Sequence, residues 1–392
     1  MLRRLAVPLF VAALTAVTAL PAHASAPAPE RREPASITVS TLGNGHGKGL
    51  SQYGARNRAN DGQTYRDIIE HYYPTTSWGE ADGMLRILIT GDTSDDVVVG
   101  ARSGLKARSL GSGKTWTLPA KRDGKTIARW RITAAGASSV VSYAAAGKWT
   151  TWRTAPGDAQ FTAGSQPMSL YTPGGVVAYR GSLRSATPDG AGRNTVNVVS
   201  LEVYLRGVVP REVPGSWPAD AVRAQAVAAR TYAVFERGNV PADRYYDLCD
   251  TASCQVYGGA SAEYSGSDAA VAATAGEIVT YDGEPAFTQF SASNGGYSVD
   301  GGYPYLVAEE DPFDHGIPED PHATTFSGDQ VTRHWTGLGD LVSVEVTERD
   351  GRGPYGGRVT ELLVTGTEGS VPATGSQFRS YLGLRTTLFT LS

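Results

Sequence analysis

One glutamate is placed where its side chain could transfer protons, because Glu212 lies between Pro210 and Pro214. Proline fixes its own φ angle and restricts the residue before it, so we expect a stiff loop to carry this carboxylate. An alanine-rich segment typical of a helix begins at about Pro218, and the N-terminus of a helix favours a nearby negative charge. A rigidly held carboxylate can act as a general acid and base. The alternative is a solvated glutamate that only caps the helix.

Several other function classes are disfavoured by the sequence. It contains neither the G-x-S-x-G motif of serine hydrolases nor the H-E-x-x-H motif of zinc proteases. An ordinary glycosidase needs two carboxyl groups flanking the bond that it cleaves, but 39 acidic residues offer no particular partner for Glu212. The formal net charge of −4 argues against nucleic acid or an anionic membrane as the main partner. We therefore expect chemistry that one carboxylate can perform, without a cofactor.

The N-terminal segment predicts export. Residues 1–24 have two arginines near the start, then an apolar run, then an Ala-x-Ala site, which together indicate a secretory signal peptide cleaved after Ala24. An uncleaved membrane anchor is the alternative, but the apolar run is short and rich in alanine. Residues 25–36 have the composition of a flexible lead-in. We expect the mature protein to lie outside the cytoplasmic membrane, with no stable membrane span.

The only two cysteines, Cys249 and Cys254, are close together in the sequence. In an exported protein a local disulfide is the favoured interpretation of such a pair. A zinc site is the alternative, but zinc normally takes four ligands and no histidine lies near the pair. We therefore predict a disulfide and no metal ligands.

Hydrophobic patterns divide the rest of the chain into three regions. Residues 37–78 contain a glycine-rich loop and a short helix that Pro74 ends. Residues 79–167 alternate short runs rich in Val, Ile, Thr and Trp with turn residues, as antiparallel strands do. Residues 168–392 hold the remaining core. Tryptophans of the β-rich region could stack on sugars, with core packing as the favoured alternative.

Four further elements are predicted in the core. Strands are expected at residues 194–200 and 277–281, and a short helix at residues 269–275. The one long helix, at about residues 218–236, has apolar or small residues on nearly every side and should be buried. These elements predict a strand-rich α+β fold.

Four motifs are spread over this core, and together they resemble the SpoIID/LytB family of bacterial cell-wall proteins. Residues 207–232, which include Glu212, are similar without a gap to the family pattern GVVxxEMP, then W, then EALKAQAVAARTY. The family pattern has methionine where this chain has Val213, and because both are apolar the glutamate should keep its position. The other three motifs are CQVYGG at residues 254–259, the serine block FTQFSASNGG at residues 287–296, and PYL at residues 304–306 followed by Asp311.

The order of two blocks differs from the family pattern. The glycine block GNGHGKGLSQYGA, residues 43–55, resembles a block that usually closes this domain, yet here it comes first. Residues 378–389 resemble the element that normally precedes that block. A circular permutation would explain both features. It predicts that a C-terminal strand at residues 388–391 lies beside an N-terminal strand at residues 37–40.

The resemblance implies a lytic transglycosylase that acts on peptidoglycan glycan strands. Glu212 matches the family's catalytic glutamate, which protonates the glycosidic oxygen and then deprotonates a sugar hydroxyl, leaving a 1,6-anhydromuramyl end. Burial should raise the pKa of Glu212, since a free glutamate is mostly ionised at neutral pH. The second implied function is a non-catalytic, wall-binding enhancer of an N-acetylmuramoyl-L-alanine amidase. Glu212 in a rigid segment favours the enzyme, which we expect to be associated with the cell wall.

Further site residues are predicted in the glycine and serine blocks. His46, Ser51 and Gln52 in the first block, with Ser291 and Ser293 in the second, could hydrogen-bond sugar hydroxyl or acetamido groups. For loops so dense in glycine, the alternative is turn geometry alone. Both blocks are expected to border the groove of Glu212, between two lobes formed by the permuted SpoIID-like unit and the β-rich region.

The long helix and the CQVYGG motif supply the remaining candidates. Gln225 and Arg230 could be buried supports of the substrate site or simply satisfied polar groups. Tyr257 and Tyr303 could stack on sugar rings, with core packing as the alternative.

Overall fold

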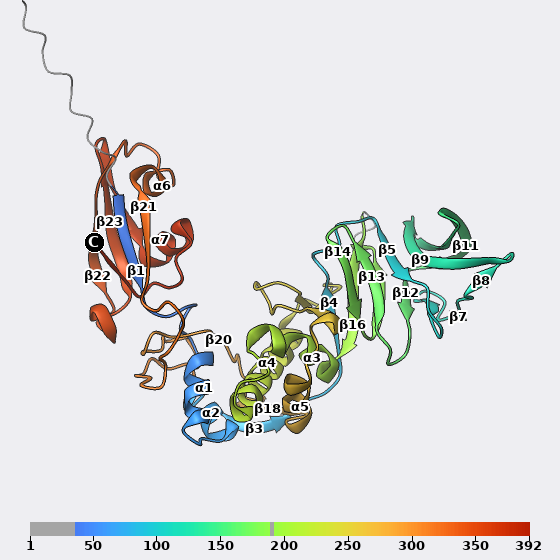
Figure 1. Ribbon diagram of the computed structural model, residues 1–392, viewed down its shortest axis with the longest axis horizontal. Helices are drawn as coiled ribbons and strands as arrows, with labels where there is room; N and C mark the ends of the chain where they lie inside the picture. Colours follow the sequence, from blue (N-terminus) through green and yellow to red (C-terminus); the bar gives the residue numbers. More distant parts are fainter. Residues whose placement is uncertain (1–35, 189–191) are drawn as a thin grey trace, which may run out of the picture.

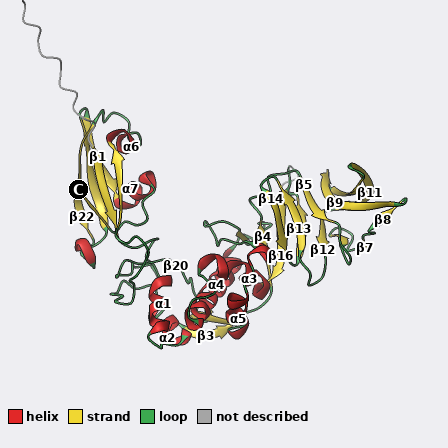
Figure 2. Ribbon diagram, viewed as in Figure 1, coloured by secondary structure: helices red, strands yellow, loops and turns green. Residues whose placement is uncertain are grey.

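The computed structural model describes residues 36–188 and 192–392. The predicted signal peptide and nearly all of the predicted lead-in lie outside these residues. The fold is 37% strand and 23% helix, which confirms the strand-rich α+β prediction. Figure 1 shows three groups of elements in a row where we expected two lobes, and Figure 2 shows that helices dominate only the middle group.

The middle group is built around the predicted long helix, α4 (Ala219–Asn239), which begins directly after Pro218. On one face of α4, Ala224 and Val227 pack with buried residues of α1 and α2. On the opposite face, Ala226 and Ala229 join the cluster that contains α3 and α5. Small side chains on both faces let the neighbouring helices approach closely. The surrounding helices are α1 (Gln52–Asn60), α2 (Tyr65–Tyr72), α3 (Leu201–Glu212), α5 (Ser265–Ala273) and the 3-10 helix η2 (Gly259–Ala262).

Short strands hold the edges of this helical group together. The order β19–β18–β3 forms one small sheet, and β2 pairs in parallel with β20. None of the helices in the described part of the chain is long and apolar enough to cross a membrane. The strands are β2 (Leu50–Ser51), β3 (Ser77–Glu80), β18 (Glu277–Tyr281), β19 (Glu284–Pro285) and β20 (Phe290–Ser291).

Two sheets form the β-rich group, antiparallel except where β17 pairs with β4, and buried residues from both join one hydrophobic cluster. The first sheet has the order β11–β10–β9–β5–β13–β14, with β8 beside β9. Its strands are β5 (Asp96–Gly100), β8 (Lys121–Arg122), β9 (Lys125–Ala135), β10 (Ser138–Ala145), β11 (Lys148–Pro156), β13 (Met168–Thr172) and β14 (Gly175–Tyr179).

The second sheet of this group has the order β17–β4–β16–β15–β12–β6–β7. It leads into the helical group, because β16 ends at Ser200 and α3 starts at the next residue. Its strands are β4 (Met84–Leu88), β6 (Lys106–Ser109), β7 (Thr115–Thr117), β12 (Ala159–Thr162), β15 (Ser182–Ala186), β16 (Asn194–Ser200) and β17 (Leu248–Cys249).

The third group contains both ends of the described chain and has a hydrophobic cluster of its own. β1 (Ser36–Thr41) lies between β21 (His322–Ser327) and β25 (Phe389–Leu391). The register of β1 and β25, with Val39 opposite Leu391, confirms the predicted pairing of terminal strands. The permutation itself stays a prediction. The other elements are β22 (Leu341–Arg349), β23 (Val359–Gly366), β24 (Gly369–Thr374), α6 (Gly328–Thr332), α7 (Gly375–Leu382) and the 3-10 helix η3 (Pro354–Gly356).

One element differs from the prediction in a way that matters for the site. Residues 201–212 form helix α3, although Pro210 lies inside it and a loop was predicted. Leu201, Tyr204, Leu205 and Val208 recur at helical spacing and are all buried. Packing of this face outweighs the penalty of a proline inside a helix.

Candidate functional site around Glu212

Glu212 is the last residue of α3, so a packed helix holds the carboxylate and the predicted loop is wrong. The Val213 N–H closes the final turn by donating to the Val209 carbonyl at 3.0 Å. Because the C-terminal end of a helix carries partial negative charge, this position favours the protonated form of the glutamate.

The surroundings of Glu212 also favour the protonated carboxyl group. Burial raises its pKa above the ordinary value, against the opposing effects of the Gln52 amide and the Arg211 charge. The Gln52 Nε2 donates to Glu212 Oε2 at 3.1 Å. The other oxygen, Oε1, has no hydrogen bond within the described part of the chain and is not among its fully enclosed polar atoms. One oxygen is therefore held in place while the other remains available to a substrate.

A cavity of about 370 Å³ opens beside Glu212. Its size lies at the small end of the range of about 300–1,000 Å³ that is usual for small-molecule sites. The glycine block, α4, the disulfide loop and the serine block all contribute to its wall, so the site brings together segments far apart in the sequence. Besides Glu212, polar and aromatic lining residues are His46, Tyr232, Ser253, Gln255, Gln289 and Phe290.

The glycine and serine blocks lie side by side, because Leu50 pairs with Phe290 and Ser51 with Ser291 in the parallel β2–β20 ladder. The Gly47 N–H donates to Ser291 Oγ at 3.2 Å. Glycine is needed at position 45, where φ is +118° and a Cβ would overlap the Ser291 side chain. Ser291 thus joins the two blocks, and its predicted contact with substrate stays a prediction.

His46 lines the cavity as a neutral imidazole. Burial lowers its pKa to about 4, with the charges of Lys48, Arg379 and Arg358 acting in the same direction and a backbone hydrogen bond to Phe290 acting against them. Its Nδ1 accepts from the Lys48 N–H at 2.9 Å, so the ring proton lies on Nε2. The Nε2–H is the donor in the hydrogen bond to the Phe290 backbone, and the neutral ring adds no positive charge near neutral pH.

Ser51 and Ser293 are each 1% exposed, and both side chains bond to buried groups of the protein. Their hydroxyl groups donate to the two oxygens of Asp314, at 2.9 and 2.7 Å. Ser51 also caps α1 by accepting the Gly54 N–H. These hydroxyl groups have internal partners and do not line the cavity, so their contact with substrate stays a prediction. Gln52, the residue after Ser51, contacts Glu212 directly.

Gln225 is 1% exposed, and neither its amide oxygen nor its nitrogen has a hydrogen-bond partner in the described part of the chain. Leaving such an amide unsatisfied costs about 1–3 kcal/mol per group. It stands seven residues before Tyr232, which lines the cavity, so both project from the same side of α4. Direct substrate contact by Gln225 stays a prediction.

Arg230 is 0% exposed, and its guanidinium is engaged by protein groups. Its Nε and Nη2 atoms donate to the two oxygens of Glu202, each at 2.8 Å, in the bidentate geometry that fixes arginine firmly. Further bonds reach Thr274 and the backbone of Val271 and Glu277. Arg230 is thus a satisfied polar group that braces α3, α4 and α5, and a role in substrate binding stays a prediction.

The two tyrosines occupy different environments, and neither lines the cavity of Glu212. Tyr257 is buried, donates to Asn197 Oδ1 at 2.8 Å and packs 4.9 Å from the Tyr204 ring. Tyr257 thus lies in the core with a bonded hydroxyl, as the packing alternative expects, and its contact with a sugar stays a prediction. Tyr303 stacks on Tyr305, with the ring centroids 5.3 Å apart. Because Tyr303 is 38% exposed, part of its ring remains accessible to solvent, outside the Glu212 cavity.

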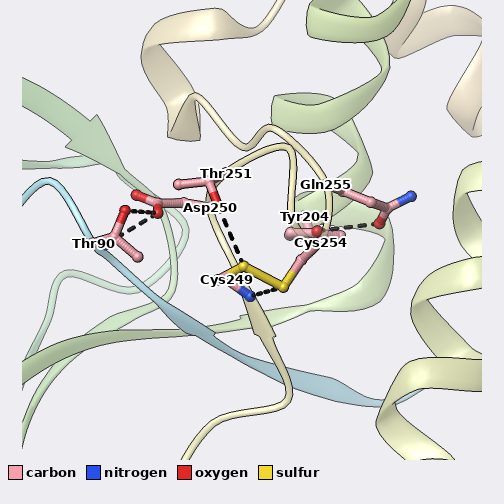
Figure 3. The surroundings of a disulfide bond; sticks show 7 residues. All are labelled: Thr90, Tyr204, Cys249, Asp250, Thr251, Cys254 and Gln255. Atoms are coloured by element: carbon pink, nitrogen blue, oxygen red, sulfur yellow. Dashed lines mark hydrogen bonds between the residues drawn. A yellow bond between two sulfur atoms is a disulfide. The ribbon is translucent and has the colours of Figure 1, made fainter. Parts of the chain in front are cut away.

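The predicted disulfide joins Cys249 and Cys254. Figure 3 shows it at the base of a short loop, with Asp250 on one side and Gln255 on the other. Gln255 is fixed by bonds from the Tyr204 hydroxyl and to the Ala229 carbonyl, each 3.2 Å long. Among the described residues, no group of three His, Cys, Asp or Glu side chains is arranged to hold a metal ion.

Several site residues were not predicted from the sequence. Tyr232 could have been found from its seven-residue spacing to Gln225, and Gln255, Gln289 and Phe290 lie within motifs already recognised. A second link between α1 and the Glu212 segment, an edge contact of 5.2 Å between the rings of Tyr53 and Trp217, had no local signal.

Comparison with known proteins finds similarity in the part of the chain that carries this site. The model of the SpoIID family, described as stage II sporulation protein, matches residues 189–281, which include Glu212 and the disulfide loop. The amidase enhancer of Bacillus subtilis (strain 168) is 40% identical over 119 residues, which are 29% of this chain and 16% of the relative. Stage II sporulation protein D of Bacillus amyloliquefaciens is 31% identical over 186 residues, which are 42% of this chain and 51% of the relative.

A third relative, stage II sporulation protein D of Bacillus subtilis (strain 168), is 49% identical over 55 residues, or 14% of this chain and 16% of the relative. The chain thus spans at most about half the length of these relatives. Residues 189–281 of this chain, which carry Glu212, are therefore similar to the SpoIID family.

Proposed function

We propose that this protein is a lytic transglycosylase that cleaves peptidoglycan glycan strands, with Glu212 as general acid and base. The observation that carries the proposal is one half-buried glutamate with a raised pKa, lining a sugar-sized cavity. The family match supports a cell-wall polymer as the substrate, because the relatives are named for sporulation and for amidase enhancement.

In the first step, the protonated Oε1 of Glu212 donates its proton to the glycosidic oxygen. The bond from the anomeric carbon to that oxygen breaks, the oxygen keeps the electron pair, and positive charge develops on the sugar. Burial and the helix C-terminus both keep the glutamate protonated before this step. The Gln52 amide holds Oε2 and orients the carboxyl group.

In the second step, the Glu212 carboxylate accepts the proton of the 6-hydroxyl of the same sugar. The hydroxyl oxygen bonds to the anomeric carbon, which produces a 1,6-anhydro ring and restores the protonated glutamate. No water is consumed, so one carboxyl group suffices where an ordinary glycosidase needs two. The Gln289 amide oxygen, which has no hydrogen-bond partner in the described part of the chain, lies nearby in the cavity wall.

The proposal is tested by incubating the purified chain with peptide-free glycan strands and analysing their ends by mass spectrometry. We expect 1,6-anhydromuramyl ends to accumulate with the unaltered protein. Glu212→Gln keeps the shape and the acceptor for Gln52 but cannot supply a proton, so the rate should fall at least about 100-fold, as for loss of a general acid.

The matched control is Glu284→Gln, which makes the same chemical change at an exposed glutamate on β19. It should leave the rate unchanged. Equal rates for the Glu212 variant and this control would remove Glu212 from the reaction.

A second candidate function, a non-catalytic amidase enhancer, is favoured by the similarity to the amidase enhancer of Bacillus subtilis. A purified N-acetylmuramoyl-L-alanine amidase, added to intact sacculi with and without this chain, would reveal it as faster release of peptides. If Glu212→Gln enhances the amidase as strongly as the unaltered protein, while neither forms anhydro ends, the enhancer is the better description.

The site of action follows from the proposed substrate. We propose that the protein is exported and acts in the cell wall, with glycan strands and a wall amidase as its partners. Cell fractionation tests this location: the mature chain should be found outside the cytoplasm, and retention in the cytoplasm would contradict it.

A further inference from the structure

A second cavity, of about 350 Å³, lies where the β-rich group meets the helical group. On one side it is lined by Thr172 of β13 and by Val177 and Tyr179 of β14. On the other side stand the end of α3, the disulfide loop and the start of η2. Gly259 has φ of +59°, and a Cβ there would lie 2.5 Å from the Ala178 carbonyl, so β14 is packed tightly against the core at this point.

This second cavity shares structural elements with the Glu212 cavity. Arg211 lines the second cavity and Glu212 the first, and consecutive residues on a helix point in directions about 100° apart. The disulfide loop likewise contributes Asp250 to the second cavity and Gln255 to the first. Figure 3 shows these two side chains on opposite sides of the disulfide. The end of α3 and the loop therefore form a partition with a cavity on each side.

The lining of the second cavity offers the contacts that a sugar ring uses. The Arg211 guanidinium has no hydrogen bond or ion pair within the described part of the chain. Asp250 Oδ1 accepts the Thr90 N–H and hydroxyl, at 3.0 and 2.6 Å, which fixes the side chain and leaves Oδ2 to accept another donor. Val177 and the ring of Tyr179 supply the apolar surface. A donor, an acceptor and an apolar wall around an open hollow are contacts that a small ligand can use.

We propose that the second cavity binds another sugar ring of the same glycan strand whose scissile bond lies at Glu212. This inference rests on the proposed function, because a polymer substrate can occupy both sides of the partition at once. It gives the β-rich group a role in holding the strand, with Val177, Arg211 and Asp250 as contact residues. The binding energy of this remote ring would favour long strands over short ones.

The test measures affinity for peptide-free glycan oligomers, from a disaccharide to an octasaccharide, in a Glu212→Gln background that prevents turnover. Val177→Trp fills the second cavity and should weaken octasaccharide binding at least about ten-fold while changing disaccharide binding less than about two-fold. Val176→Trp is the matched control, because the neighbouring valine is 55% exposed and points away from the cavity.

Asp250→Asn is a second variant that preserves the acceptor for Thr90 and the size of the side chain, so it should fold even if the tryptophan variant does not. It should also weaken binding of the octasaccharide more than that of the disaccharide. Equal length dependence in all the folded variants would overturn the inference, as would failure of the parent to bind any oligomer. Because affinity is measured without turnover, this result is separate from whether the unaltered protein forms anhydro ends.

Discussion

At the scale of single residues, Glu212 combines three features that act on its protonation. It ends a helix, it is half-buried, and it accepts one hydrogen bond from Gln52. The first two favour the neutral acid and the third favours the carboxylate. A group that must donate a proton and then accept one needs such a balance, because a pKa far from the working pH would slow one of the two steps.

Removal of the Gln52 amide should change the pH dependence of the reaction. Gln52→Met keeps the length of the side chain but loses the hydrogen bond that lowers the pKa of Glu212. The protonated fraction of the acid falls as pH rises through its pKa, so a higher pKa moves the basic limb of the rate profile to higher pH. The initial rate of anhydro-end formation, measured over a range of pH, checks this. Gln166→Met, at an exposed position, should leave the profile unchanged, and no shift with Gln52→Met would contradict the role of the amide.

The stability of the protein should also depend on the charge of Glu212. A carboxyl group with a raised pKa in the folded state favours folding while it is protonated, and this contribution is lost as pH rises through the folded-state pKa. Glu212→Gln removes the charge that is costly at neutral pH. The melting temperature of this variant should therefore exceed that of the unaltered protein at neutral pH, with a smaller difference below the ordinary pKa of a glutamate. A lower melting temperature at neutral pH would show that burial does not destabilise the carboxylate.

At the scale of elements, the sequence predicts those whose pattern is local and strong. The strands at residues 194–200 and 277–281 match β16 and β18, and α4 lies within three residues of its predicted bounds. Helix α3 was missed because the proline inside it was given more weight than the helical spacing of its buried residues. The contacts of Gln52 and Tyr53 with the Glu212 segment join residues about 160 positions apart, and no local pattern reports them.

The packing of α3 against the disulfide loop depends on one glycine. A Cβ at Gly207 would lie 2.5 Å from the Tyr257 ring and 2.8 Å from the Gly259 carbonyl. Gly207→Ala should therefore destabilise the protein by about 1–3 kcal/mol, as overpacking usually does. Gly238→Ala, near the end of α4 with open space around it, should instead stabilise by up to about 1 kcal/mol. Urea unfolding measures the free energy of unfolding of both variants. Equal values for the two variants would contradict the close packing of α3.

At the scale of the whole molecule, the two ends of the described chain meet in one sheet. The Thr38 N–H donates to the Ser392 carbonyl at 2.8 Å, and the Ser392 N–H donates back at 3.0 Å. The segment after β1 then crosses to the middle group and delivers Gln52 to Glu212. The reversed order of two family blocks allowed the β1–β25 contact to be predicted from the sequence. Nothing in the sequence predicted that the terminal elements would form a third group with its own core.

Because the two ends of the described chain are adjacent, we predict that the protein folds when its segments are joined in a different order. A protein that starts at residue 83, continues to residue 392 and is joined by a short glycine–serine linker to residues 36–82 should fold. Its melting temperature should lie within about 5 °C of the parent, since the new ends fall in the irregular segment between β3 and β4 and the linker spans a short gap. Calorimetry measures this directly. Failure of the reordered chain to fold would show that the present order of segments is required.

The most direct test of the central claim follows the fate of water in the proposed reaction. Peptide-free glycan strands are cleaved in water enriched in heavy oxygen, and the new ends are weighed by mass spectrometry. If Glu212 drives intramolecular transfer, the ends are 1,6-anhydro sugars without heavy oxygen, and Glu212→Gln abolishes them. Heavy oxygen in new reducing ends, or unlabelled anhydro ends formed equally well by Glu212→Gln, would contradict the account.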